Sequence, residues 1–221
     1  MNPSTVLSIG NRLLRVISRV NIVGQENLPK TGPVIFTINH LGLLDPLLGY
    51  VAAGRTDVTG WVANKHTKNP VISYFVNSLG GIWIDRENVD MQALRKAIQA
   101  LKDGRLFGLA PEGTRSPTAA LIPAKEGASY LALSTGAPVV PGAITGTEKV
   151  PKSWLRLTRP RIGICIGKPF HLNQDKSRDR EQVMAQATDE IMCRIAALLP
   201  QNYRGAYADH PRLKQLLAEG T

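Results

Sequence analysis

Short apolar runs rich in β-branched and aromatic residues alternate with amphipathic stretches of helical period through most of the chain. Such runs between turn signals are typical of buried strands, and apolar positions at helical spacing are typical of helices. We expect strands at residues 33–38, 58–63, 82–84, 106–110, 138–144 and 161–167, and helices at 4–20, 46–53, 70–80, 90–103, 125–134 and 180–199. The alternation predicts the α/β class: a layered domain with a largely parallel or mixed central sheet flanked by helices.

The length of the chain bears on the number of domains, and its charge bears on the kind of binding partner. The 221 residues are enough for one domain, and we expect a single domain over 1–221 with its core at 33–200. The chain has 27 Lys and Arg against 17 Asp and Glu, a formal net charge of +10. Such an excess indicates an anionic partner: nucleic acid, a phospholipid surface or a phosphorylated substrate. Composition alone does not choose among them.

The cysteines and the apolar segments bear on the compartment. Cys165 and Cys193 fall in a predicted strand and a predicted helix, without CxxC spacing, and we interpret them as reduced core residues of a cytoplasmic protein. The sequence has no apolar run of the roughly 18 residues that a spanning helix needs. The N-terminus lacks the unbroken apolar segment of a signal peptide.

The N-terminal segment, 1–22, contains an amphipathic stretch that we expect to be helical over 4–20. On a helix its apolar stripe lies within an arc of about 100°, and three arginines line one flank. The stripe consists of Val6, Ile9, Leu13, Val16, Ile17 and Val20, and the flank of Arg12, Arg15 and Arg19. The helix either lies in a membrane interface or packs on the domain, because both arrangements need this stripe.

A possible catalytic pair follows the first predicted core strand. His40 and Asp45 lie between strand 33–38 and a helix that opens at Pro46, with Asp45 as its N-cap. Five residues of continuous helix would leave the two side chains about 140° apart, so only a turn at Gly42 brings them together. They are then either a base with its orienting carboxylate, or a helix cap beside a loop histidine. Spacing alone favours the second interpretation.

Polar residues also follow other predicted strands. His40, Arg86 and Glu112 each come just after a strand, and such residues converge on one crevice in sheets of this type. The sequence contains no GxSxG, GxGxxG, HExxH or P-loop pattern, and no serine or cysteine stands in an obvious nucleophile setting. Covalent catalysis is therefore not indicated.

Four short blocks follow one another between residues 39 and 141. They are Asn39-His40-(four residues)-Asp45, Gly81-Ile82-Trp83-Ile84-Asp85-Arg86, Pro111-Glu112-Gly113-Thr114-Arg115-Ser116 and Val139-Val140-Pro141. In this order and at these separations they resemble the four-block pattern of the glycerolipid acyltransferases, in particular the 1-acyl-sn-glycerol-3-phosphate acyltransferases. Because of this resemblance, we interpret His40 and Asp45 as a catalytic pair, and no longer as a loop histidine beside a helix cap.

The resemblance implies an O-acyltransferase of phospholipid biosynthesis, with 33–200 as its catalytic core. It would move a fatty acyl group from acyl-CoA or acyl-ACP to a lysophospholipid, with lysophosphatidate giving phosphatidate as the expected reaction. His40 would be the general base and Asp45 its orienter, with no permanently bound cofactor and no metal. The substrate-binding residues implied are Arg86, Glu112, Gly113, Thr114 and Arg115, with Lys125 and Lys65 as further candidates.

Two features modify this expectation. The family often has a Gly-containing hairpin after the third block, where this chain has Pro117 to Leu121, so the shape of that loop is open. A second basic segment surrounds Trp154 with no acidic residue between 149 and 161, and contains Lys149, Lys152, Arg156, Arg159 and Arg161. It suits an anionic bilayer, the phosphates of coenzyme A or a solvated loop. We expect peripheral attachment to the cytoplasmic face of an anionic membrane.

Other functions remain to be weighed. The acceptor is alternatively another lysolipid or an aminolipid, which only an acceptor panel separates. A non-enzymatic basic lipid-binding protein gives no reason for the His40–Asp45 pair. A nucleic-acid-binding protein would explain the charge but not the third block, and aromatic residues are only 5% of the chain. We therefore expect no nucleic-acid partner.

Overall fold

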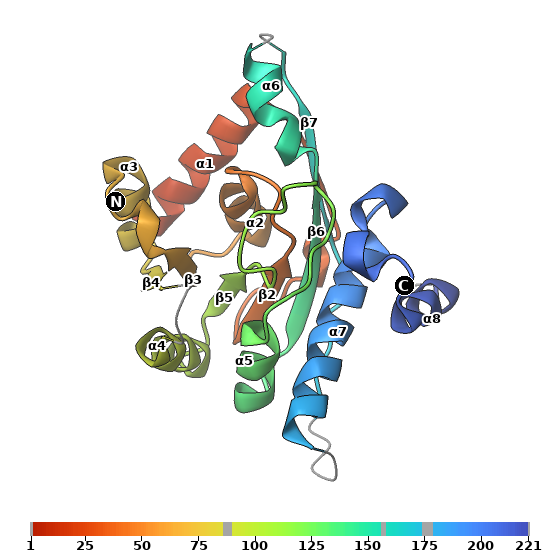
Figure 1. Cartoon of the computed structure of the whole chain (residues 1–221). Coiled ribbons are helices and arrows are strands. Elements are labelled where there is room, and N and C mark those ends of the chain that lie inside the picture. Colours follow the sequence, from red (N-terminus) through yellow and green to blue (C-terminus); the bar gives the residue numbers. More distant parts are fainter. Residues whose placement is uncertain (1, 86–89, 156–157, 174–178, 221) are drawn as a thin grey trace.

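A seven-stranded mixed sheet forms the centre of the computed structural model, which describes residues 2–85, 90–155, 158–173 and 179–220 (Figure 1). The strand order is β1-β7-β6-β2-β5-β3-β4, and every neighbouring pair is parallel except β6 with β7. The strands are β1 (Arg19–Val23), β2 (Val34–Ile38), β3 (Val58–Ala63), β4 (Ile82–Ile84), β5 (Leu106–Leu109), β6 (Val139–Thr145) and β7 (Arg161–Ile166). The predicted fold class is confirmed.

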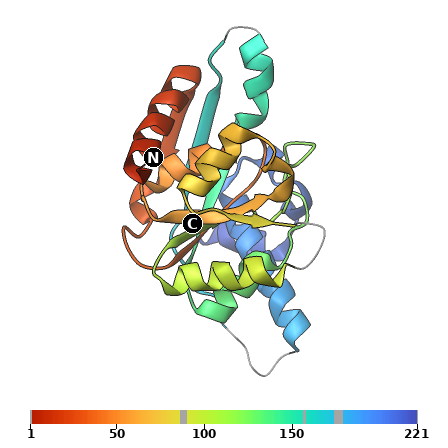
Figure 2. The ribbon, with the colours of Figure 1, turned by 90° about the vertical axis from the view of Figure 1, so that its left-hand side faces the viewer.

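Helices cover both faces of the sheet (Figures 1 and 2). On one face lie α4 (Met91–Lys102), α5 (Gly127–Thr135) and α7 (Arg180–Leu198), with α8 (Pro211–Ala218) packed outside α7. The other face carries α2 (Asp45–Ala53), and α1 (Pro3–Ile17) packs on α2. Helix α3 (Pro70–Ser78) lies beside the β4 edge of the sheet, and α6 (Val150–Leu155) extends beyond the end of β6. Within the described ranges, no helix combines the length and apolarity that crossing a bilayer requires.

The central strands are buried on both faces. Ile35 of β2, Phe107 of β5 and Val139 of β6 are fully inaccessible to solvent, as expected for strands sandwiched between helix layers. The strands β2, β3, β4, β5 and β6 run parallel to one another. The carboxyl ends of β2, β3, β4, β5 and β6 therefore meet at one edge of the sheet, the edge at which the site lies.

The N-terminal segment differs from its prediction as one helix over 4–20. The helix ends at Ile17, because Ser18 turns its backbone away and both its N–H and its hydroxyl bond to the carbonyl of Leu14. The chain then pairs with β7 as the edge strand β1. The β-branched Val20 and Ile22 alternate with exposed residues, which suits a strand with one covered face.

The C-terminal segment after Pro200, where the sequence predicts no helix or strand, packs against the domain. It buries Tyr203, Tyr207, Leu213 and Leu216. The hydroxyl of Tyr203 donates to Glu148 at 2.7 Å, and burial raises the pKa of Tyr203 to about 12. The backbone of this segment also bonds to Leu121, in the loop that follows the third sequence block. The C-terminus therefore braces two loops near the site.

The two cysteines are free. Cys193 is buried against His210, with 3.2 Å between Sγ and Nδ1. This nitrogen also accepts the N–H of Arg212 and caps α8, so the thiol is the donor in the contact. Burial raises the pKa of Cys193 to about 12, which keeps the thiol protonated and suits a packing role.

Candidate active site

His40 and Asp45 are in direct contact in the loop between β2 and α2. His40 Nδ1 lies 2.7 Å from Asp45 Oδ2. The side chain of Asp45 is completely buried, whereas that of His40 is 15% exposed. The loop therefore holds the carboxylate inside the protein and presents one edge of the imidazole to the surface.

The predicted N-cap role of Asp45 is wrong. Asp45 is the first residue of α2 and makes no cap bond, because its carboxylate turns back onto the preceding loop. There Oδ2 accepts the N–H groups of Leu41 and Gly42, at 2.6 and 2.7 Å. The other oxygen, Oδ1, accepts the hydroxyl of Thr147 at 2.5 Å. Three donors besides His40 thus fix the plane of the carboxylate.

This arrangement sets the tautomer of His40. A carboxylate held by three other donors is an acceptor toward the imidazole, so Nδ1 carries the hydrogen. The lone pair then lies on Nε2, on the ring edge that is not bonded to Asp45. An imidazole in this state takes a proton from a hydroxyl placed at Nε2.

Glu112 holds the backbone of His40. Its side chain is buried, with Oε1 accepting the N–H of His40 at 2.8 Å and Oε2 that of Ile122 at 3.1 Å. The carbonyl of His40 accepts the N–H of Ser116 at 2.8 Å. Burial raises the pKa of Glu112 above its ordinary value. The substrate-binding role that we predicted for Glu112 stays a prediction, and the structure shows that both of its oxygens accept backbone N–H groups.

Gly42 and Thr147 form a contact that sequence reasoning missed. A Cβ on Gly42 would lie 2.9 Å from the carbonyl oxygen of Thr147. Glycine is therefore required at position 42 because the Thr147 backbone lies so close to it, and not because the backbone adopts a positive φ. Thr147 follows the end of β6 as His40 follows the end of β2. The strand-end argument applied to His40 would have found it, although nothing in the sequence links it to Asp45, 102 positions away.

The predicted substrate-binding residues fall into three groups. Gly113 has a positive φ of 68°, and a Cβ there would lie 3.1 Å from the side chain of Lys125, so this loop and Lys125 are adjacent. Thr114 and Arg115 are exposed beside them. Lys65 is exposed in a short 3-10 helix at the carboxyl end of β3, on the same edge of the sheet. The prediction for Arg86 lies outside the described residues.

A pocket of about 580 Å³ opens next to Gly113 and Lys125. It lies at the carboxyl ends of β4 and β5, against α4 and α5. Its wall is largely apolar and includes Trp61, Ile84, Met91, Leu94, Leu109 and Met184. A pocket of this size and lining accepts a chain of methylene groups, with Lys125 at its polar side.

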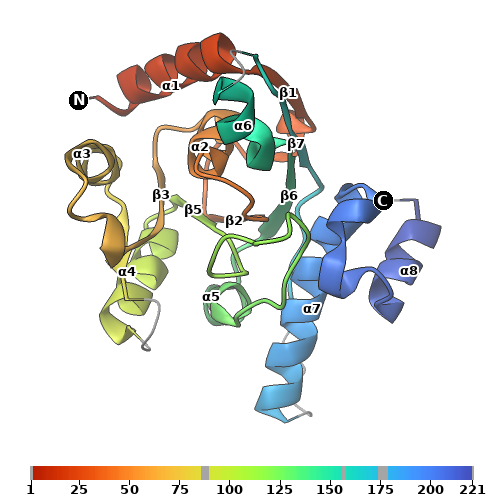
Figure 3. The ribbon, with the colours of Figure 1, turned by 45° about the horizontal axis from the view of Figure 1, so that its top comes forward.

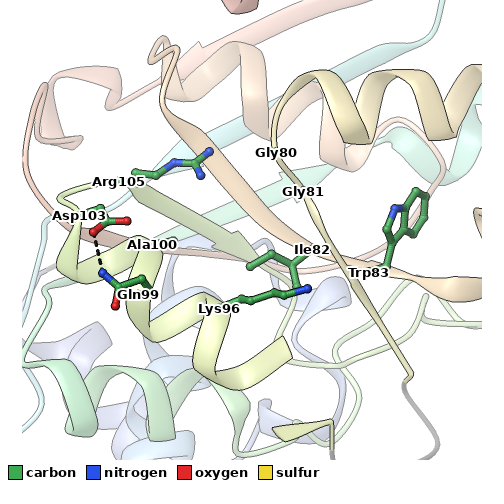
Figure 4. Close-up of a pocket in the computed structure, with 9 residues that line it drawn as sticks. All are labelled: Gly80, Gly81, Ile82, Trp83, Lys96, Gln99, Ala100, Asp103 and Arg105. Carbon is green, nitrogen blue, oxygen red and sulfur yellow. Dashed lines mark hydrogen bonds between the residues drawn. The ribbon is translucent and has the colours of Figure 1, made fainter. Parts of the chain in front are cut away.

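A second pocket, of about 370 Å³, lies at the opposite edge of the sheet (Figure 4). It is lined by Gly81, which precedes β4, and by Arg105, which precedes β5. The guanidinium of Arg105 donates to the backbone carbonyls of Asp57, Val58 and Leu79, so it braces loops. Among the described residues, no group of three His, Cys, Asp or Glu side chains is arranged to hold a metal ion.

Comparison with known proteins identifies the family to which this sequence and fold belong. The model of the Acyltransferase family matches residues 19–145, which is more than half of the chain. The chain therefore belongs to the acyltransferase family of enzymes.

Named relatives agree with this family. The chain is 27% identical to the 1-acyl-sn-glycerol-3-phosphate acyltransferase of Bacillus subtilis over 84% of this chain and 91% of the relative. It is 29% identical to the protein of the same name from Borreliella burgdorferi over 59% of this chain, but spans only 52% of that relative. The crystal structure of the 1-acyl-sn-glycerophosphate (LPA) acyltransferase from Thermotoga maritima superposes with a TM-score of 0.67. It is 28% identical, covering 86% of this chain and 76% of that one.

Proposed function

We propose that this acyltransferase moves a fatty acyl group from acyl-CoA or acyl-ACP to the free hydroxyl of lysophosphatidate, giving phosphatidate. The contact between His40 Nδ1 and the buried carboxylate of Asp45 carries the proposal. Because Nδ1 is bonded to Asp45, Nε2 of His40 is the nitrogen that acts as the base, and the hydrogen bonds of the loop hold it in position. The names of the relatives support lysophosphatidate as the acceptor.

In the proposed reaction, His40 Nε2 accepts the proton of the acceptor hydroxyl as its oxygen attacks the thioester carbonyl. The tetrahedral intermediate then expels the thiolate of the donor, and the imidazolium returns the proton to that sulfur. Asp45 keeps the ring oriented and stabilises its transient positive charge. The proton of the acceptor hydroxyl thus ends on the thiol of the released donor, and the enzyme returns to its starting state.

The proposed acceptor headgroup site is the loop that contains Arg115 and Lys125, beside a pocket whose polar lining also includes Asp85, Asp90, Glu126 and Arg180. Arg115 and Lys125 offer charge-assisted hydrogen bonds to a phosphate, and Gly113 lets the backbone come close to it. Lys65, on the same edge of the sheet, is a further cation for the phosphate groups of acceptor or donor. Arg86 is included on its sequence position alone. The apolar pocket next to Lys125 is proposed to hold an acyl chain.

We further propose that the enzyme works as a peripheral protein on the cytoplasmic face of an anionic membrane. The +10 charge and the basic, amphipathic N-terminal helix support this location. A membrane location also fits the proposed substrate, because lysophospholipids partition into bilayers.

An acceptor panel tests the reaction. Purified enzyme is supplied with either acyl-CoA or acyl-ACP as the donor. Each donor is combined in parallel with lysophosphatidate, the corresponding unphosphorylated monoacylglycerol, a lysophospholipid with an amine headgroup and an aminolipid as the acceptor. We expect thiol release and phosphatidate formation with lysophosphatidate, and little turnover without the phosphate. Preferred use of an aminolipid or an unphosphorylated acceptor would contradict the assigned acceptor, and no thiol release with any acceptor would contradict the proposed reaction.

A further inference from the structure

The segment between α7 and α8 packs against two loops at the active-site edge of the sheet. It consists of two short 3-10 turns, η4 (Gln201–Tyr203) and η5 (Gly205–Tyr207). Figures 1 and 3 show this segment in blue beside β6. It lies outside the four sequence blocks, so the resemblance assigns it no role. We call residues 201–207 the C-terminal brace.

The first contact of the brace joins Tyr203 to Glu148. The hydroxyl of Tyr203 donates to Oε1 of Glu148 at 2.7 Å. The other oxygen, Oε2, is buried and accepts no hydrogen bond from the part of the chain that the structure describes. Lys149 Nζ lies 3.9 Å from Oε1, at the end of an exposed side chain. A carboxylate in this position depends on its one close donor, because a buried charge without donors is costly.

The position of Glu148 affects Thr147, its neighbour in the chain. Both residues belong to the 3-10 turn η3 (Thr147–Lys149), which follows β6. A turn this short has few backbone dihedrals, so a shift of Glu148 moves Thr147 as well. The hydroxyl of Thr147 donates to Oδ1 of Asp45 at 2.5 Å, and Oδ2 of Asp45 lies 2.7 Å from Nδ1 of His40. Tyr203 is therefore linked to the orientation of the imidazole.

The second contact of the brace is with the loop after the third block. The N–H of Leu121 donates to the carbonyl of Tyr203, and the carbonyl of Leu121 accepts the N–H of Ala206, both at 2.9 Å. Gly205 makes this pairing possible, because a Cβ there would lie 2.1 Å from the carbonyl oxygen of Leu121. Its φ of 44° also favours glycine.

This loop reaches His40 by a separate route. Ile122, next to Leu121, donates its N–H to Oε2 of Glu112 at 3.1 Å, and Oε1 of Glu112 accepts the N–H of His40 at 2.8 Å. The brace thus supports the side chain of His40 through one loop and its backbone through the other. Tyr203 belongs to both routes, with its hydroxyl in the first and its carbonyl in the second.

We propose that Tyr203 is a positioning residue for acyl transfer, whose hydroxyl fixes the Thr147 turn through Glu148 and so holds Asp45 in place against His40. The inference rests on the proposed function, because the group being oriented is the proposed base. Tyr203 acts through other residues, so its hydroxyl serves turnover and not the binding of the acceptor.

The variant Y203F tests the role of the hydroxyl. It removes one oxygen atom and keeps the aromatic ring and the backbone bonds to Leu121. Y50F is the matched control, because Tyr50 is also buried and its hydroxyl donates at 2.9 Å to the carbonyl of Pro3, away from the site. E148Q and the double variant Y203F/E148Q complete a double-mutant cycle.

Three measurements are made on each variant. Thiol release from acyl-CoA with lysophosphatidate gives kcat and KM, and urea titration shows that each protein is folded under the assay conditions. Hydrogen–deuterium exchange is followed by NMR at the amides of Leu41 and Gly42. These amides donate to Oδ2 of Asp45, so their exchange reports how firmly the carboxylate is held, independently of turnover.

We expect Y203F to lower kcat about tenfold with KM for lysophosphatidate within about twofold of wild type, because a small displacement of a catalytic group slows the chemical step. Exchange at Leu41 and Gly42 becomes about tenfold faster in Y203F. Y50F keeps the wild-type kcat and exchange rates, and E148Q keeps most of kcat, because its amide oxygen still accepts the hydroxyl. The double variant is more active than Y203F, because an uncharged amide tolerates the loss of its donor better than a carboxylate.

Wild-type kcat and exchange rates in folded Y203F would overturn the inference. Equal losses of kcat in Y203F and Y50F would also overturn it, because the effect would then follow general stability. A deficit of Y203F that is unchanged in the E148Q background would show that Tyr203 does not act through Glu148. Absence of thiol release by the wild type would instead count against the proposed function, and the exchange rates would still decide whether Tyr203 holds Asp45.

Discussion

Thr147 is the one described side chain whose hydroxyl bonds to Oδ1 of Asp45, the oxygen that does not contact His40. Backbone amides fix Oδ2, but a carboxylate held by one oxygen retains freedom to rotate about its axis. Thr147 therefore acts on His40 through Asp45, and we regard it as a positioning residue. Its own carbonyl is packed against Gly42, which fixes its distance from the loop.

Substitution of Thr147 tests this role. T147V keeps the shape of the side chain and removes the hydroxyl, so the hydrogen bond to a charged group is lost, at a cost of about 1.5–3 kcal/mol. We expect kcat to fall about 10- to 100-fold with KM for the acceptor nearly unchanged, and T147S to recover most of the rate. Steady-state thiol release measures both constants. A T147V enzyme with the kcat of wild type would show that Asp45 needs no support from Thr147.

Residue-scale prediction from sequence succeeded where neighbours in the chain meet and failed where distant segments meet. The contact of His40 with Asp45 spans one loop. Spacing alone did not predict it, and the order of the four sequence blocks was needed to favour a catalytic pair. The contacts of Glu112 with His40 and of Thr147 with Asp45 depend on the sheet order, which no local pattern contains. The sequence consequently did not predict that Glu112 binds the backbone of His40.

At the scale of elements, buried strands were predicted within one or two residues, because continuous apolar runs and flanking turn residues define them. The junction of α1 with β1 was missed, since Val20 continues the helical stripe as well as it begins a strand. The loop after the third block also has a specific form. Ala119 adopts a φ of 60°, a conformation that glycine takes more readily.

The C-terminal helix was invisible in the sequence because its packing residues are few and its partner is far away. Glu190 of α7 accepts hydrogen bonds from Arg212 of α8 at 2.6 Å and from Arg194 at 2.6 Å. Burial acts to raise the pKa of Glu190, but the hydrogen bonds and charges of these arginines outweigh it and lower the pKa. The network therefore stabilises the folded protein when Glu190 is ionised.

The pH dependence of stability tests that network. Because the pKa of Glu190 is lower in the folded than in the unfolded protein, its contribution is complete above the unfolded value and is lost as pH falls through the folded value. We expect E190Q to lower the free energy of unfolding by about 1–2 kcal/mol at neutral pH. Urea titrations at neutral and acid pH should show this difference shrinking at acid pH. An equal difference at both values would contradict an electrostatic role.

At the scale of the whole molecule, the topology brings together groups from most of the chain at one edge of the sheet. His40 lies in the loop that follows β2. Glu112 follows β5 and contacts the backbone of His40, and Thr147 follows β6 and contacts Asp45 at the end of the same loop. The rule that strand ends converge predicted this edge from sequence. The pocket could not be predicted, because it depends on which helix faces are left uncovered once the layers have packed.

The most direct test of the account compares two histidine variants in acyl-CoA thiol release with lysophosphatidate. H40A removes the proposed base, whereas H171A removes an exposed imidazole that contacts the carbonyl of Gly136, outside the site. We predict that H40A lowers the rate by about 10²- to 10⁴-fold while vesicle binding and the unfolding transition persist, and that H171A is as active as wild type. Thiol release by folded H40A within a few-fold of wild type would contradict the central claim that His40 is the catalytic base.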